Sequence, residues 1–257
     1  MKVLIVGRSG TGKDTLANIL TNQYVLQQVI SYTTRPKRFP EENTHRFVTE
    51  EEAGAIQDRI AETTINGYEY FATTKQVEEA DVYIVDPEGF YQVVKKMSDT
   101  HFMLVYMRAS EGLARAYAIT RAENMARETI VYNERTAAEA EQFTLFEDAL
   151  ADRENFRRYK NCSMIVDHTN DYTEESMQSL ARTIAAHVHL WENLLKVVEV
   201  AAAHKILEEK HGRIRVMYKD WSYEWLSPDN FVASIVNDNE GLGMLARQCL
   251  FLPEVKI

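Results

Sequence analysis

The stretch that decides the fold reads Lys2-Val3-Leu4-Ile5-Val6-Gly7-Arg8-Ser9-Gly10-Thr11-Gly12-Lys13-Asp14-Thr15. Its apolar first part predicts a buried strand, and residues 16–20 have the composition of a helix. The glycines between them match the spacing G-x-x-x-x-G-K, in which consecutive backbone N–H groups surround an anion. The sequence therefore predicts a phosphate-binding loop between the first strand and the first helix. The alternative is a glycine-rich turn that binds nothing.

Individual residues of this loop have separate expected roles. Glycine permits left-handed backbone angles and a close approach to phosphate, and the ammonium group of Lys13 supplies a positive charge for the β- and γ-phosphates. Asp14 stands where Ser or Thr usually follows the lysine, and Thr15 offers a hydroxyl one position later. Asp14 and Thr15 are therefore the expected protein ligands of Mg²⁺. The residues expected to hold the phosphates are Gly7, Ser9, Gly10, Thr11, Gly12, Lys13, Asp14 and Thr15.

The composition of the whole chain limits its class. Its 257 residues are 45% hydrophobic and 26% charged, as in an ordinary globular protein. The formal net charge of −10 argues against a general affinity for nucleic acid or an anionic membrane, so an anionic nucleotide needs a locally basic pocket. Cys162 and Cys249 lie far apart, the first residues lack the layout of a secretory signal, and residues 3–6 are too few to span a bilayer. A reducing, cytoplasmic location is expected.

Strands and helices are expected to alternate over most of the chain. Apolar segments predict strands at residues 2–6, 24–30, 81–86, 102–107 and 163–166, with helical patterns between most of them. This alternation predicts an α/β fold with a parallel, doubly wound sheet.

A basic loop follows the second expected strand and reads Ser31-Tyr32-Thr33-Thr34-Arg35-Pro36-Lys37-Arg38-Phe39-Pro40. Arginine can bind phosphate oxygens through paired, planar hydrogen bonds, although a solvated basic loop is the alternative. Residues 31–78 carry short, mixed elements and are interpreted as a small inserted subdomain. Asp86 then ends a strand at the sheet edge where ligands bind, or else only caps the following helix.

More arginines lie in and beside a polar, alanine-rich helical region at residues 110–142. They are Arg108, Arg115, Arg121, Arg127 and Arg135. Arginines on a mobile helical arm can close over phosphates and replace water with fixed positive charge. The alternative is a solvated helix whose arginines pair with its own glutamates.

The pattern changes beyond residue 173. Apolar residues three or four apart predict one helix over 174–210, ended by Gly212. Such a length favours a homodimer, although packing against the domain's own surface is the commoner outcome. A strand at 213–218, an aromatic cluster (Trp221, Tyr223, Trp225) and a short helix from Ser227 are expected next, and no chemistry is indicated there.

Several motifs, taken in order, resemble guanylate kinase. They are the phosphate loop, residues 31–38, Glu41, Phe47-Val48, Gly67 with Tyr70-Phe71-Ala72-Thr73, and Asp86. The resemblance covers about residues 1–185 and leaves 186–257 as a C-terminal helical extension of unknown role. It implies a three-layer P-loop NTPase fold with a nucleotide-monophosphate-binding insert at about 31–78 and a helical lid at about 110–142. It also implies phosphoryl transfer from ATP, with Mg²⁺, to GMP or dGMP.

The resemblance also implies roles for individual residues. Those implied to be catalytic are Lys13, Arg35, Arg121 and Arg135. Those implied to bind GMP are Ser31, Arg35, Arg38, Glu41, His45, Glu62, Tyr70, Thr73 and Asp86. Arg35 and Arg38 would hold the acceptor phosphate, and Arg121 and Arg135 would be lid arginines.

Some positions depart from the family. His45 stands where a phosphate-binding tyrosine is usual, which would make acceptor affinity depend on pH near neutrality. Phe71 stands where a second tyrosine is usual, so the phenol would come from Tyr70. Guanine presents N1–H and an amino group as donors, which a carboxylate of Glu62 or Asp86 would accept, and a hydroxyl of Ser31 or Thr73 would donate to its O6.

Two other functions fit the same residues. One is a kinase of the same architecture for another nucleoside monophosphate or a sugar phosphate. The other is a non-catalytic binding module with a guanylate-kinase-like fold. Gly12 and Lys13 favour an enzyme, because a scaffold has no need of a phosphate-cradling lysine.

Overall fold

The computed structural model describes residues 1–37, 39–120, 125–152, 162–204, 209–210, 213–217 and 223–226. It divides into two compact units, Met1–Ala181 and Arg182–Ile257. Arg38, Arg121, Arg127's side chain, Trp221 and the helix expected from Ser227 lie outside the described residues.

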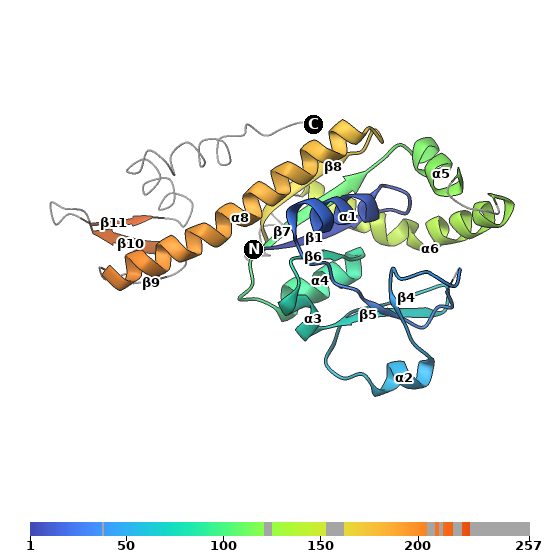
Figure 1. The fold of residues 1–257 in the computed structure, drawn as a ribbon, viewed down its shortest axis with the longest axis horizontal. Helices are drawn as coiled ribbons and strands as arrows, with labels where there is room; N and C mark the ends of the chain where they lie inside the picture. Colours follow the sequence, from blue (N-terminus) through green and yellow to red (C-terminus); the bar gives the residue numbers. More distant parts are fainter. Residues whose placement is uncertain are drawn as a thin grey trace. The chain divides into compact units, whose positions relative to one another are not determined.

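The described strands and helices follow one another as labelled in Figure 1. The strands are β1 (Lys2–Gly7), β2 (Tyr32–Thr33), β3 (Arg46–Phe47), β4 (Arg59–Ile65), β5 (Tyr68–Thr73), β6 (Val82–Ile84), β7 (Phe102–Arg108), β8 (Cys162–Thr169), β9 (Glu209–Lys210), β10 (Arg213–Met217) and β11 (Tyr223–Leu226). The helices are α1 (Lys13–Tyr24), α2 (Glu50–Ala55), α3 (Thr74–Glu79), α4 (Pro87–Lys96), α5 (Glu111–Thr120), α6 (Met125–Ala151) and α8 (Glu174–His204).

The main sheet of the first unit has the strand order β6-β1-β7-β8, and every pair is parallel. This confirms the expected mixed α/β fold with a parallel sheet. The strand expected at residues 24–30 is wrong, because α1 continues to Tyr24 and the segment then forms only a single bridge, from Gln28 to Val82. Its apolar residues Leu26 and Val29 are buried, so they read as a strand although they pack as a connecting loop.

Both faces of the main sheet are buried. Side chains alternate along a strand, and Leu4 and Tyr106 on one face join Phe90 of α4 and Phe146 of α6 in one apolar cluster. Ile5 and its alternate neighbours face the other way and are also fully buried. Strands buried on both faces are typical of parallel sheets and explain their continuous apolar sequences.

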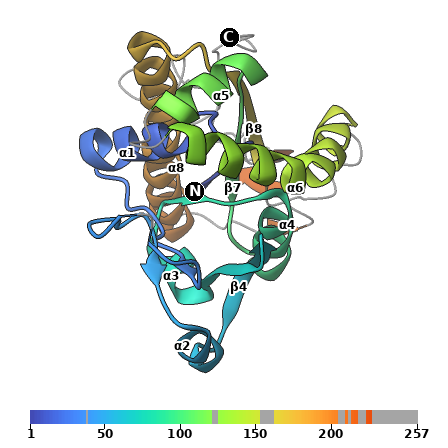
Figure 2. The same cartoon turned by 90° about the vertical axis from the view of Figure 1, so that its right-hand side faces the viewer.

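A second sheet has the order β3-β2-β5-β4 and is built from the segment between α1 and α3. The hairpin of β4 and β5 turns at Asn66 and Gly67, which both have positive φ angles. Capping boxes begin the two short helices, with Thr49 before α2 and Thr73 before α3. Figure 2 shows α2, α3 and β4 together, away from α5 and α6.

Helices α5 and α6 occupy the region expected to be helical at 110–142, and α6 continues past the expected end to Ala151. In the C-terminal unit, α8 ends at His204 within the described residues, and β9, β10 and β11 form an antiparallel sheet. The strand expected at 213–218 corresponds to β10. Among the described helices, none is both long and apolar enough to cross a membrane.

Phe146 anchors α6 to the core, so its truncation tests the packing. Its ring lies 5.5 Å from that of Phe90 and 5.6 Å from that of Tyr91, and the side chain is fully buried. Phe146→Ala should lower the free energy of unfolding by about 3–5 kcal/mol in chemical denaturation. The control is Leu145→Ala, next to it on α6 but 64% exposed, which should cost under about 1 kcal/mol. Equal losses for the two variants would contradict this packing.

Candidate functional site

The phosphate loop joins β1 to α1 through two left-handed glycines. Gly10 has a φ of 82° and Gly12 a φ of 91°, and Gly12 caps α1. A Cβ at Gly10 would lie 2.5 Å from the backbone oxygen of Ala114, so α5 also approaches too closely for a side chain. The hydroxyl of Thr11 donates to the carbonyl of Arg8 at 2.9 Å and braces the turn from inside. The glycines expected from the sequence are therefore required by the geometry.

The ammonium group of Lys13 is held at this loop. Nζ donates to the carbonyl oxygens of Gly7 at 2.6 Å and Arg8 at 2.8 Å. Burial lowers the pKa of Lys13, while the nearby carboxylates of Asp14 and Glu139 act in the opposite direction. The lysine thus lies beside the anion cradle, where an incoming phosphate can replace the carbonyls as its partner.

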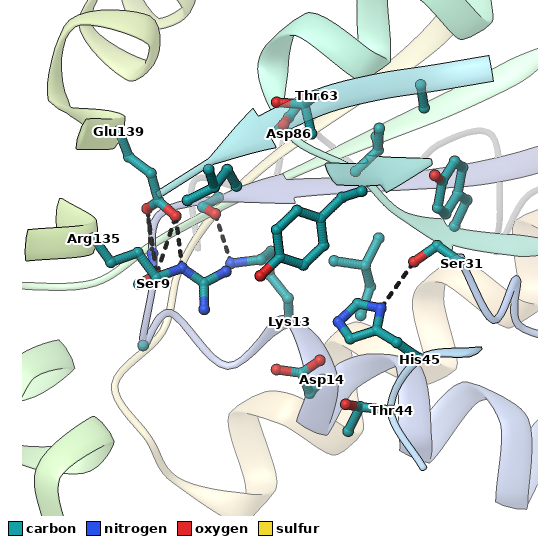
Figure 3. Close-up of a pocket in the computed structure, with 18 of the residues that line it drawn as sticks. Ser9, Lys13, Asp14, Ser31, Thr44, His45, Thr63, Asp86, Arg135 and Glu139 are labelled. Carbon is teal, nitrogen blue, oxygen red and sulfur yellow. Dashed lines mark hydrogen bonds and ion pairs between the residues drawn. The ribbon is translucent and has the colours of Figure 1, made fainter. Parts of the chain in front are cut away.

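A cavity of about 220 Å³ opens beside the loop (Figure 3). Residues from β1, the basic loop, β4, β5, the end of β6, α5 and α6 line it. It brings together eleven of the residues expected from the sequence: Gly7, Ser9, Gly10, Lys13, Asp14, Ser31, Arg35, His45, Tyr70, Asp86 and Arg135.

Other expected residues lie elsewhere. Gly12 and Thr15 line a second cavity, of about 200 Å³, together with Tyr117 and Tyr172. The rings of these two tyrosines are tilted against each other with centroids 4.8 Å apart. Thr15 does not line the first cavity, because one residue along a helix rotates the side chain by about 100° from Asp14.

Three expected guanylate-binding residues also lie outside the first cavity. Glu41 is exposed. Glu62 forms an ion pair with Arg59 at 3.1 Å and is 49% exposed. Thr73 is occupied as the cap of α3, where its hydroxyl accepts from the N–H of Gln76 at 3.2 Å. Of the two carboxylates considered for guanine, Asp86 alone lines the cavity.

Arg35 is held by Glu42, a residue that sequence reasoning missed. Its guanidinium donates two hydrogen bonds to the Glu42 carboxylate, at 2.8 and 3.0 Å, and Glu42 is only 2% exposed. The Arg35 guanidinium also lies 5.0 Å from the ring centroid of Phe47. Two adjacent glutamates follow the basic loop, and nothing local in the sequence tells which of Glu41 and Glu42 turns inward.

His45 lies in an aromatic pocket rather than in solvent. Its Nδ1 lies 3.0 Å from the Ser31 hydroxyl, and its ring contacts those of Phe47 and Tyr70 edge to face. Burial, and then the charge of Arg35, lower the pKa of His45 to about 4. The imidazole is therefore neutral at pH 7. This differs from the titration near neutrality that the residue type suggested.

Asp86 both caps a helix and faces the cavity. One carboxylate oxygen accepts from the N–H of Gly89 at 2.7 Å at the start of α4. The other, Oδ2, is buried and accepts no hydrogen bond within the described residues, with Thr63 beside the carboxylate in Figure 3. Burial raises the pKa of Asp86, which shows a carboxylate short of donors. Both interpretations of Asp86 from the sequence, as cap and as cavity residue, therefore hold.

Helix α6 presents Arg135 and Glu139 to the phosphate loop. Arg135 Nε donates to Glu139 Oε1 at 2.9 Å, and the Ser9 hydroxyl lies 3.3 Å from both oxygens of that carboxylate. The backbone N–H of Ser9 donates to Oε2 at 3.4 Å. Sequence reasoning singled out Arg135 but missed Glu139, for which the four-residue spacing on the helix was the available signal. Within the described residues, no group of three or more His, Cys, Asp or Glu could hold a metal ion.

Comparisons with known proteins give limited similarity. No family model matches the chain, and no curated protein matches it. Among solved structures, guanylate kinase from Anaplasma phagocytophilum is similar, with 14% sequence identity and a TM-score of 0.41. The match covers 72% of this chain and 85% of that chain. Similarity at this level leaves the activity to be argued from the site itself.

The low pKa of His45 predicts a pH-dependent stability. The unfolded imidazole, with a pKa near 6.5, binds a proton that the folded one, with a pKa of about 4, resists. This contribution is complete above pH 6.5 and is lost as the pH falls toward 4. His45→Asn should remove it, so the free energy of unfolding of the parent should fall by roughly 2 kcal/mol more than that of the variant between pH 7.5 and 4.5. A difference that stays constant over this range would contradict the prediction.

Proposed function

We propose that this protein is a nucleoside-monophosphate kinase that transfers a phosphoryl group from ATP to GMP or dGMP. The observation that carries the proposal is a single cavity lined both by a phosphate loop with its lysine and by Arg35, His45 and Asp86. A hydrolase of nucleoside triphosphates needs the loop alone. A second set of anion and base contacts in the same cavity fits a second nucleotide.

On the donor side, the loop N–H groups and Lys13 would hold the β- and γ-phosphates of ATP. The second cavity lies on the other side of Gly12, and the stacked rings of Tyr117 and Tyr172 would offer a flat apolar surface to the donor base. Mg²⁺ arriving with ATP would neutralise phosphate charge, and Asp14, whose carboxylate lines the first cavity, fits a metal that takes one or two carboxylates beside phosphates and water. Thr15 lines the second cavity instead, so we assign it no part in metal binding.

On the acceptor side, Arg35 would bind the phosphate of GMP. Glu42 fixes the plane of its guanidinium, so Nε and the remaining N–H groups are oriented before the substrate arrives. The neutral imidazole of His45 and the hydroxyl of Tyr70 would add uncharged contacts to the same phosphate.

The base of the acceptor would be read by Asp86. Its unpartnered oxygen can accept from N1–H and the amino group of guanine. Adenine has no donor at N1, so it would leave this buried oxygen unpaired at a cost of about 1–3 kcal/mol. This contrast favours guanine as the acceptor base.

The reaction itself would be a direct in-line transfer. The attacking phosphate oxygen of GMP forms the new P–O bond while the bond to the β-phosphate of ATP breaks, giving GDP and ADP. Lys13 and Arg135 both line the cavity and would neutralise charge on the transferred group. Arg38 and Arg121, which the resemblance also implies, would belong to the acceptor site and the lid.

Removing the loop lysine tests the donor half. Lys13→Met should lower kcat/KM for ATP-dependent phosphorylation of GMP by about 100-fold or more, because the transition state loses a positive charge in the cradle. The matched control is Lys75→Met on α3, whose exposed side chain pairs only with Glu79 at 3.7 Å. Activity should be measured beside dGMP, AMP, UMP and dTMP. Full activity in Lys13→Met, or no turnover of any acceptor by the parent, would reject the kinase.

Exchanging the paired arginine tests the acceptor half. Lysine cannot reproduce the two parallel hydrogen bonds that Arg35 makes, so Arg35→Lys should raise KM for GMP at least about tenfold with little change in KM for ATP. Arg46→Lys is the control, because Arg46 is exposed and contacts the Tyr32 ring. A rise in KM for ATP alone would place Arg35 on the donor instead.

A further inference from the structure

Glu139 already places an anion at the phosphate loop. Its carboxylate is 7% exposed and accepts from the Ser9 N–H, the Ser9 hydroxyl and Arg135. Those are donors of the kind that hold a phosphate oxygen: a loop N–H, a hydroxyl and a guanidinium. The same carboxylate lines the cavity and interacts electrostatically with Lys13.

From these contacts we infer that Glu139 is an internal occupant of the phosphate loop, which a polyphosphate must displace in order to bind. The inference rests on the proposed function only in taking the loop as an anion site. Displacement exchanges one anion for another: the Ser9 N–H and Arg135 leave the carboxylate and donate to phosphate oxygens. Glu139 therefore keeps these donors oriented while the loop holds no phosphate, and it opposes weakly charged anions that cannot repay its release.

The packing of α6 sets how this exchange proceeds. One turn beyond Glu139, Phe143 is 2% exposed, and Phe146 is fully buried in the core. Glu147, on the same helix, is bound by Arg8 at 3.3 Å and by the Tyr106 hydroxyl at 2.6 Å. The C-terminal half of α6 is thus anchored. Release of the Glu139 carboxylate occurs by rotation of its side chain, with or without movement of the helix before Arg135.

Binding of inorganic tripolyphosphate to the full chain, measured by titration calorimetry, tests the inference. Glu139→Gln keeps an oxygen for Arg135 but loses the charge, so it should bind about tenfold more tightly than the parent. Glu141→Gln removes the same charge from an exposed position of α6 and should bind within about twofold of the parent. Thermal unfolding confirms that each variant is folded, and Glu139→Ala serves if the glutamine variant is not.

A shorter acid separates occupation from simple charge repulsion. Glu139→Asp keeps the charge, but its carboxylate is one methylene shorter and cannot reach both Ser9 and Arg135. Occupation predicts that this variant also binds tripolyphosphate more tightly than the parent. Unchanged affinity in Glu139→Asp, or equal or weaker binding in Glu139→Gln, would overturn the inference.

The two proposals fail in different ways. Tighter binding by the Glu139 variants without turnover of GMP by the parent would uphold the internal occupant and reject the kinase. Turnover of GMP with no gain in tripolyphosphate affinity would do the reverse. If neither parent nor variants bind tripolyphosphate, the loop is not an anion site and the inference is overturned.

Discussion

The left-handed backbone at Gly10 and Gly12 is the constraint on which the rest of the site depends. Only such angles let the chain leave a buried strand and enter α1 with its N–H groups directed into a turn. Lys13 then reaches back to the carbonyls of Gly7 and Arg8. The close approach of Ala114 to Gly10 means that α5, too, takes its position from the absence of a side chain there.

Charge is arranged around this turn so that an acidic protein can receive an anion. The chain has a net charge of −10, yet its cavity gathers Lys13, Arg35 and Arg135. Glu42 and Glu139 each pair with one of the two arginines. Such pairs add little net stability, because desolvation offsets their attraction, but they fix the direction of each guanidinium. Orientation is what binding a planar array of phosphate oxygens requires.

The parts of this structure that could be predicted from sequence are those set by local pattern. The phosphate loop, the parallel strands and the capping box at Thr49 follow from spacing over a few residues. The misread strand at 24–30 had apolar residues in a segment that makes only one bridge. Which of two adjacent glutamates pairs with Arg35 depends on how the loop folds over Phe47.

Long-range placement accounts for the remaining differences at the site. Glu139 meets Ser9 across 130 positions of sequence, and no local pattern predicts the rotation of α6 that brings them together. Glu62 and Thr73 have suitable chemistry but are engaged by Arg59 and by the start of α3. Residue type thus indicated what could bind, and tertiary packing selected which residues face the cavity.

Asp86 has a consequence for how this protein could evolve. The same carboxylate begins α4 and faces the region where an acceptor base would lie. Replacing an N-cap aspartate costs about 1 kcal/mol, and α4 carries Phe90 into the core. A lineage that changed the base preference by substituting Asp86 would therefore weaken its own fold in the same step. Acceptor preference should consequently drift through residues around Asp86, which bear no such double duty, before it drifts through Asp86 itself.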